Sequence, residues 1–160
     1  MATKYWLGVA DAVAQVATVQ VTAFDATTSY RLTVGGVLIA VAGVTDVNAT
    51  ATALAAAWNA STHPYCAAVT AVADTDTVTL TADTAGVPFV VASSVSAGTG
   101  TIGSVTESVA NAGPNDWSSA DNWSDGSIPA NGDTVIFRAN AINVCWGLNQ
   151  AAVTIDNLFI

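Results

Sequence analysis

The stretch WSSADNWSDGSIPANGDTVIF, residues 117–137, gathers residue types that could bind a ligand. Trp117 and Trp123 could stack on sugar rings, with Asp121 and Asn122 as polar partners. The competing interpretation is structural: the two tryptophans pack an irregular loop against a sheet, and each indole N–H finds a carbonyl acceptor. We favour the structural interpretation and keep Trp117, Asp121 and Trp123 as candidate ligand or partner contacts.

Carboxylates in the same region raise the question of a calcium site. Calcium takes about six to eight oxygen ligands, and Asp116, Asp121, Asp125 and Asp133 could supply some of them. Their spacing matches neither an EF-hand nor a nonapeptide repeat, whereas Asp is common in turns because it bonds to the nearby backbone. We therefore predict turn-forming aspartates, no metal site and no cofactor.

The sequence lacks the residues that most catalytic sites require. His63 is the only histidine and Glu107 the only glutamate, and no serine lies in a nucleophile-elbow motif. A glycosidase could use two aspartates alone, but the C-terminal region offers too few strands to form a substrate groove. We expect His63, beside Pro64, to lie in a surface loop, and we expect no enzymatic activity.

The elements that position these residues are mainly strands. Apolar and hydroxyl residues alternate from Gln15 to Gly43, and Gly35-Gly36 predicts a two-residue hairpin turn. In TDTVTLTAD the threonines fall on one face, and Val78 and Leu80 fall on the other. Further short strands are predicted in VPFVV (87–91) and, near the C-terminus, in GDTVIF, AINVCW and AAVTIDNLFI.

One helix interrupts this pattern at about residues 46–60. Val47, Ala51, Leu54 and Trp58 recur at helical spacing, alanine favours helix, and Thr45 or Asp46 can cap the N-terminus. The predicted fold is therefore mainly β: a β-sandwich-like or strand-helix-strand module with one α-helix, followed by a small β-rich module.

The turn-rich segment SAGTGTIGSVTESVANAGPND marks a boundary between these modules. We predict a β-rich module with one helix over residues 1–107, a linker over 108–116, and a β-rich tryptophan-containing module over 117–160. Cys66 and Cys145 lack metal-site or redox-motif spacing and are expected to be free, buried thiols.

Composition restricts the partners of the chain. Charged residues make up only 9% of the 160 residues, and the formal net charge is −9, so no basic patch is available for nucleic acid. No apolar run reaches the roughly 18 residues of a membrane span. The N-terminus imitates a signal peptide, but Asp11 interrupts its apolar stretch and Lys4 is its only basic residue, so we expect none.

Two stretches resemble known proteins. TATALAAAWNAS followed by VTLTADTAGVPFVV resembles a strand-helix-strand module of tailed-bacteriophage structural proteins. NWSDGSIPANGDTVIF, running on to VTIDNLFI, is similar to the lead-in of right-handed β-helix proteins of phage virions and bacterial surfaces. This resemblance implies that the small β-rich module is β-helix-like. KYWLG resembles the start of such phage proteins, where it usually runs directly into the tryptophan motif. Insertion of one module within the other would explain the separation here.

The resemblance implies a structural subunit of a bacteriophage virion: a head-decoration, head-fibre or tail-associated protein, made in the host cytoplasm. The expected partners are further copies of the chain, with a trimer favoured by analogy, and other virion proteins. Leu158, Phe159 and Ile160 are the candidate oligomer contact, because no charge or proline protects that strand edge. The alternative is a secreted or surface carbohydrate-binding module or adhesin with the tryptophan loop as its sugar platform.

Overall fold

The computed structural model describes residues 2–138, 144, 146–148 and 152–160. The protein is mainly β with one main helix, as predicted. Its contacts divide it into two compact units. The terminal unit comprises Met1–Val13, Ala85–Val87 and Asn111–Ile160, and the inserted unit comprises Ala14–Thr84 and Pro88–Ala110.

This division differs from the predicted one at both ends of the first module. Residues up to Val13 join the C-terminal residues instead of the strands that follow them. The chain passes back to the terminal unit after Ala110, so no separate linker covers residues 108–116. The inserted unit therefore separates KYWLG from the tryptophan stretch in sequence, while the terminal unit contains both.

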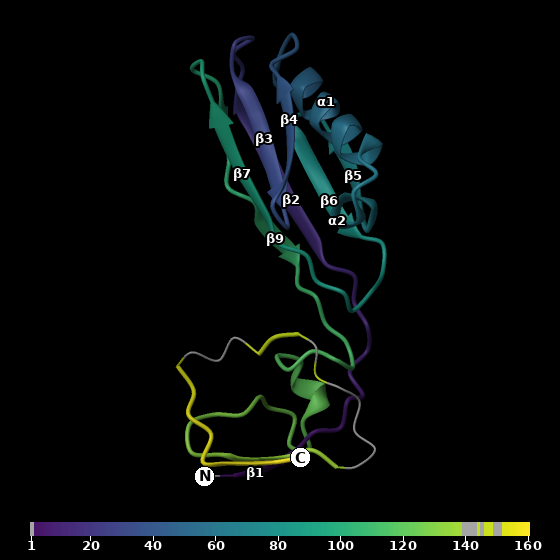
Figure 1. The fold of residues 1–160 in the computed structure, drawn as a ribbon, viewed down its shortest axis with the longest axis vertical. Coiled ribbons are helices and arrows are strands. Elements are labelled where there is room, and N and C mark those ends of the chain that lie inside the picture. Colours follow the sequence, from purple (N-terminus) through teal and green to yellow (C-terminus); the bar gives the residue numbers. More distant parts are fainter. Residues whose placement is uncertain (1, 139–143, 145, 149–151) are drawn as a thin grey trace. The chain divides into compact units, whose positions relative to one another are not determined.

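Two antiparallel sheets form the inserted unit (Figure 1). The first has the order β5-β6-β2-β8, with β9 also pairing with β2, and the second has the order β4-β3-β7. The strands of the first sheet are β2 (Val16–Ala23), β5 (Val69–Asp74), β6 (Thr77–Ala82), β8 (Thr101–Ile102) and β9 (Thr106–Val109). Those of the second are β3 (Ser29–Val34), β4 (Val37–Ala42) and β7 (Val91–Ser96).

Local sequence explains most of these strands. Val34 pairs with Val37 across Gly35 and Gly36, whose φ angles of 53° and 83° suit the tight turn that glycine permits, so the predicted hairpin is confirmed. On β6, Val78 and Leu80 are completely buried, while the threonines are half-buried on the opposite face. The predicted alternation is confirmed there.

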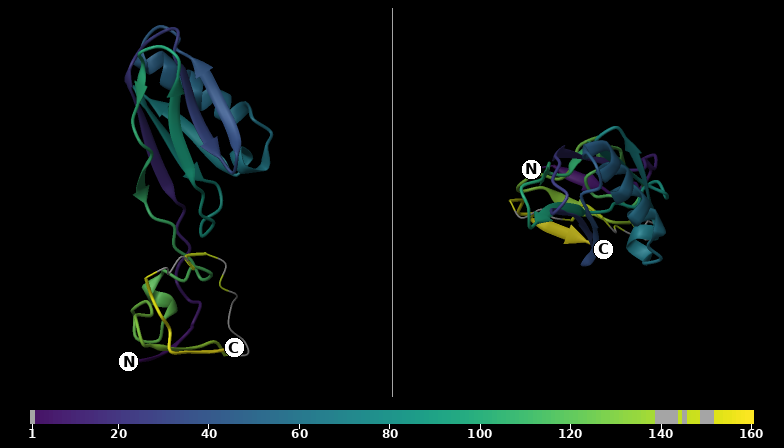
Figure 2. Two further views of the ribbon diagram at one scale, coloured as in Figure 1. Left: turned by 60° about the vertical axis from the view of Figure 1, so that its left-hand side comes forward. Right: turned by 90° about the horizontal axis from the view of Figure 1, so that it is seen from above.

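Helix α1 (Val47–Ala60) confirms the predicted helix. Asp46 caps it, because its carboxylate accepts a hydrogen bond from Ala49 N at 2.8 Å. A one-turn helix, α2 (Pro64–Ala67), follows, with His63 as its N-cap. Figures 1 and 2 show α1 running alongside the strands of the inserted unit.

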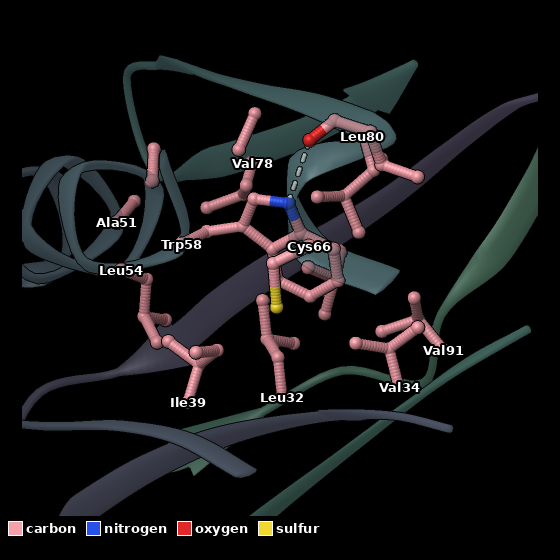
Figure 3. Close-up of a cluster of buried hydrophobic side chains, with 14 of the residues drawn as sticks. Leu32, Val34, Ile39, Ala51, Leu54, Trp58, Cys66, Val78, Leu80 and Val91 are labelled. Atoms are coloured by element: carbon pink, nitrogen blue, oxygen red, sulfur yellow. Dashed lines mark hydrogen bonds between the residues drawn. The ribbon is translucent and has the colours of Figure 1, made fainter. Parts of the chain in front are cut away.

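The buried stripe of α1 completes the core between the two sheets. Ala51, Leu54 and Trp58 are all 0% exposed and belong to one hydrophobic cluster with side chains from both sheets. Figure 3 shows the Trp58 ring at the centre of this cluster, beside the buried thiol Cys66. Cys145 lies outside the described residues.

Side chains at the end of α1 also form hydrogen bonds with backbone groups on the free edge of β5. Trp58 Nε1 donates to Val69 O at 2.7 Å. The Asn59 amide exchanges two hydrogen bonds with the Ala71 backbone, at 2.7 and 2.9 Å. Because β5 lies at the end of its sheet, these side chains occupy groups that would otherwise be open to another strand.

The terminal unit is built on three short parallel strands, β1 (Thr3–Tyr5), β10 (Thr134–Ile136) and β11 (Asn157–Phe159). Thr3, Thr134 and Asn157 lie in register, and the next two rows follow in step. Successive coils of a β-helix stack in this way. A short 3-10 helix, η1 (Ala120–Asn122), lies between the two tryptophans of the loop.

Several predicted strands differ from the structure. VPFVV contributes only Val91 to a strand, and near the C-terminus only Asn157–Phe159 of AAVTIDNLFI forms one. The turn-rich segment 96–116 contains β8 and β9, which sequence reasoning missed. Most of AINVCW lies outside the described residues. In the described part of the chain, no helix is long and apolar enough to cross a membrane.

Candidate functional site

The two tryptophans of the candidate loop lie in an aromatic cluster of the terminal unit. The Trp123 ring contacts Trp6 edge-on at a centroid distance of 4.9 Å and Trp117 at 4.6 Å. Phe137 packs against the same rings. The cluster therefore joins the N-terminal segment, the loop and the residues that follow β10.

Burial decides what these rings can contact. Trp117 is 3% exposed and Trp123 is 1% exposed, so neither has a free face on which a sugar could stack. Trp123 Nε1 donates to Trp117 O at 2.9 Å, as expected for a structural tryptophan. The expectation is wrong for Trp117, whose buried Nε1 has no partner within the described residues. Asp121 is exposed on η1.

Asn122 holds the loop together. Its side chain is completely buried, and Nδ2 donates to Gly113 O at 2.7 Å and to Asp116 O at 2.8 Å. Its Oδ1 accepts a hydrogen bond from Ala10 N at 2.8 Å. An amide that satisfies three buried backbone groups fixes the loop and the N-terminal segment to each other. Sequence reasoning assigned Asn122 only a polar role beside a sugar.

Lys4 is a buried cation in the same unit. Only 4% of the residue is exposed, and Nζ donates to Asp125 Oδ2 at 2.7 Å, to Ser127 Oγ at 2.7 Å and to Ser127 O at 3.1 Å. Asp133 Oδ2 lies 3.9 Å away. Sequence reasoning missed this role, although a lone lysine in a chain with few charges was a signal for it.

The aspartates near Lys4 accept hydrogen bonds from groups of the same unit. Asp133 is 5% exposed and accepts hydrogen bonds from Ala2 N at 2.7 Å and from Ala130 N at 3.0 Å. The bond from Ala130 N, followed by the one from Ala2 N, lowers the pKa of Asp133 below its ordinary value of 3.8. The hydrogen bond from Lys4 lowers the pKa of Asp125 in the same way.

These shifts predict acid sensitivity. A carboxyl group whose pKa is lower in the folded state stabilises the fold above its unfolded pKa, and this contribution is lost as the pH falls through the folded value. We expect the free energy of unfolding to decrease steadily from about pH 4 downward, measured by urea titration with tryptophan fluorescence. Asp133→Asn should weaken the dependence of the free energy of unfolding on pH. Equal stability of the wild type at pH 5 and pH 2 would contradict the prediction.

The four aspartates do not converge on one point. Asp116 accepts hydrogen bonds from Ser118 N at 2.9 Å, Ser118 Oγ at 2.6 Å and Asn111 Nδ2 at 2.8 Å, which is the local bonding of a turn. In the part of the chain that the structure describes, no three His, Cys, Asp or Glu side chains form a group that could hold a metal ion. His63 is exposed, and its Nδ1 accepts a hydrogen bond from Tyr65 N at the start of α2.

The tryptophan loop, residues 117–124, bonds to β1, the edge strand of the parallel sheet, and to the residues that follow it. Tyr5 N donates to Ser124 Oγ at 3.1 Å, and Ser124 N donates to Tyr5 O at 3.0 Å. Trp6 forms an antiparallel bridge with Trp123, and Leu7 N donates to Asn122 O at 2.7 Å. Since β1 lies at the end of the sheet, the two bonds with Ser124 satisfy the Tyr5 backbone groups that face away from β10.

The opposite edge is open. β11 is the last strand of the sheet; its residues Leu158 and Phe159 are 54% and 55% exposed, and Ile160, which follows it, is 98% exposed. Leu158 is in register with Val135, which is completely buried. In a parallel stack, residues in register point to the same side, so Leu158 continues a core row, and no strand of the described residues is stacked beyond it.

No protein-family model matches the chain, and no curated protein sequence does either. The geometry brings Trp117 and Trp123 together in a core and leaves Asp121 on the surface. It places Leu158, Phe159 and Ile160 at an uncovered strand edge. A strand edge with no partner among the described residues is suited to binding another strand.

Proposed function

We propose that this protein is a structural subunit of a tailed-bacteriophage virion that acts by self-assembly. The open edge of β11 carries the proposal, because three consecutive apolar residues are exposed there. At the other end of the same sheet, Ser124 occupies the outward backbone groups of Tyr5, and Trp123 and Asn122 pair with the residues that follow β1. Exposed apolar strand edges are otherwise avoided in proteins that remain monomers.

The surface supports the same proposal. Only 9% of the residues are charged, and the exposed sheet faces of the inserted unit consist largely of threonine, serine and alanine. Short side chains lose little conformational entropy when they are ordered in a contact, and permanent interfaces are poor in lysine and glutamate.

The virion assignment rests on the resemblance of the tryptophan stretch to the lead-in of phage β-helix proteins. The parallel strands β1, β10 and β11 are consistent with it, because a β-helix stacks its coils in parallel. We propose a head-decoration, head-fibre or tail-associated subunit without enzymatic activity, made in the host cytoplasm. Its partners would be further copies of itself, with three copies favoured, and other virion proteins.

Mass spectrometry of purified virions tests the assignment. We expect the protein in many copies per particle, resistant to washing at moderate salt because the contact is apolar. Particles that lack the protein would contradict the virion assignment. Binding of the folded protein to a glycan array would favour the carbohydrate-binding alternative, for which no exposed tryptophan platform exists in the loop.

A further inference from the structure

The outer face of the β4-β3-β7 sheet carries one cation among small side chains. β3 lies between β4 and β7 (Figure 1), and its Arg31 pairs with Ala40 of β4 and Ser94 of β7. Tyr30 and Leu32 are buried, so Arg31 points away from the core. The remaining residues of this face are small or carry a hydroxyl, apart from one leucine: Ser29, Thr33, Leu38, Ala42, Ala92 and Ser96.

Arg31 has no ionic partner in the described part of the chain. Its Nε donates to Ser29 Oγ at 3.4 Å, and the described ion pairs all involve Lys4. A guanidinium group has several donors in a planar fork that fits a carboxylate. The centre of this flat face can therefore accept a carboxylate from another molecule.

The opposite outer face of the inserted unit has the complementary charge. It belongs to β5, β6 and β2, whose outward rows are rich in threonine and contain no lysine or arginine. Asp74 lies in one row, opposite Thr77, and is exposed. Asp76 accepts hydrogen bonds from side chains of this face, and so does Asp83.

The other two cations of the chain are already engaged. Lys4 is buried in its contacts with Asp125 and Ser127. Arg138 lies over the Tyr5 ring, 4.6 Å from its centroid. Copies with a net charge of −9 repel one another, so a contact between inserted units is most favourable where Arg31 meets an acidic face.

We propose that the Arg31 face of one copy binds the threonine-rich acidic face of a second copy, with Asp74 as the principal partner of Arg31. In the described residues, the Asp74 carboxylate has no hydrogen-bond partner, whereas Asp76 and Asp83 are each held by neighbours. This inference rests on the proposed self-assembly and adds a second contact to the one at β11.

The two faces are different surfaces of one unit, so the contact is heterologous. Such contacts form a closed ring when the rotation between copies closes and an open array when it does not. Short side chains on both faces allow the sheets to approach closely. The electrostatic part of the contact weakens as salt screens the charges.

Sedimentation of the full-length protein tests the inference. Arg31→Glu and the milder Arg31→Gln should each weaken assembly, the former by about tenfold or more in dissociation constant. The double variant Arg31→Glu with Asp74→Arg should restore it, because the charges are exchanged between the faces. Arg138→Glu makes the same change in net charge in the terminal unit and should leave this contact intact. Circular dichroism verifies that each variant folds.

Each result discriminates between the two proposals. An oligomeric wild type that Arg31→Glu leaves unchanged would overturn this inference and leave self-assembly through β11 standing. Equal weakening by Arg138→Glu, or no rescue by the double variant, would also overturn it, because the effect would then reflect net charge or local damage. A monomeric wild type would overturn both proposals.

Discussion

Replacement of Trp58 by alanine is expected to lower the free energy of unfolding by about 3 to 5 kcal/mol. The side chain is 0% exposed and packs in the core between α1 and the two sheets (Figure 3). Its removal leaves a cavity and also deprives Val69 O of the hydrogen bond from Nε1. Chemical denaturation of the wild type and the variant measures the difference.

Asn48→Ala is the matched control on the exposed side of α1. Asn48 is exposed, and its side chain makes no hydrogen bond within the described residues, so the change should cost less than about 0.5 kcal/mol. Losses of similar, small size at both positions would show that the helix does not pack through Trp58 against the sheets.

Elements whose residues have a local physical reason for their conformation were predictable. The Gly35-Gly36 turn, the alternation of β6 and the spacing of Leu54 and Trp58 each depend on near neighbours in the sequence. The open apolar edge at Leu158 was predictable as well, because three consecutive apolar residues carry no protective charge.

Pairings between distant residues were not predictable. β9 forms from exposed residues with no alternating pattern, and it exists because β2 offers a free edge over Val16 to Thr18. Similarly, Asn122 accepts a hydrogen bond from Ala10 N, although the whole inserted unit lies between these two residues in the sequence. An Asn-rich loop gives no local signal that distinguishes a buried amide from one that faces solvent.

The tryptophan loop shows how function and structure compete for the same residue types. Two tryptophans beside aspartate and asparagine suit a sugar site, yet the same residues bury an aromatic core and satisfy its backbone. The deciding quantity is the exposed fraction of each ring, which depends on Trp6 from the N-terminal segment. Sequence distance conceals that contact.

Phe159→Asp is expected to dissociate the oligomer that we propose. Phe159 lies on the last strand of the sheet and is half-exposed, so a partner strand at this edge would bury it. Burial of a phenylalanine side chain contributes about 1.5 to 3 kcal/mol, and a carboxylate at the same position would have to be desolvated. Together these terms predict a dissociation constant at least about 100-fold higher, which sedimentation at micromolar concentration would detect.

Val9→Asp provides the comparison for this edge. Val9 is also an exposed apolar residue of the terminal unit, at 64%, and the substitution adds the same charge outside β11. If one contact lies at β11, Val9→Asp assembles as tightly as the wild type, while Phe159→Asp assembles at least about 100-fold more weakly with unchanged circular dichroism. A Phe159→Asp variant that assembles as tightly as the wild type would contradict a contact at β11. Because Ser124 already occupies the outward backbone groups of Tyr5 in β1, β11 is the edge at which we expect a second strand to extend this sheet.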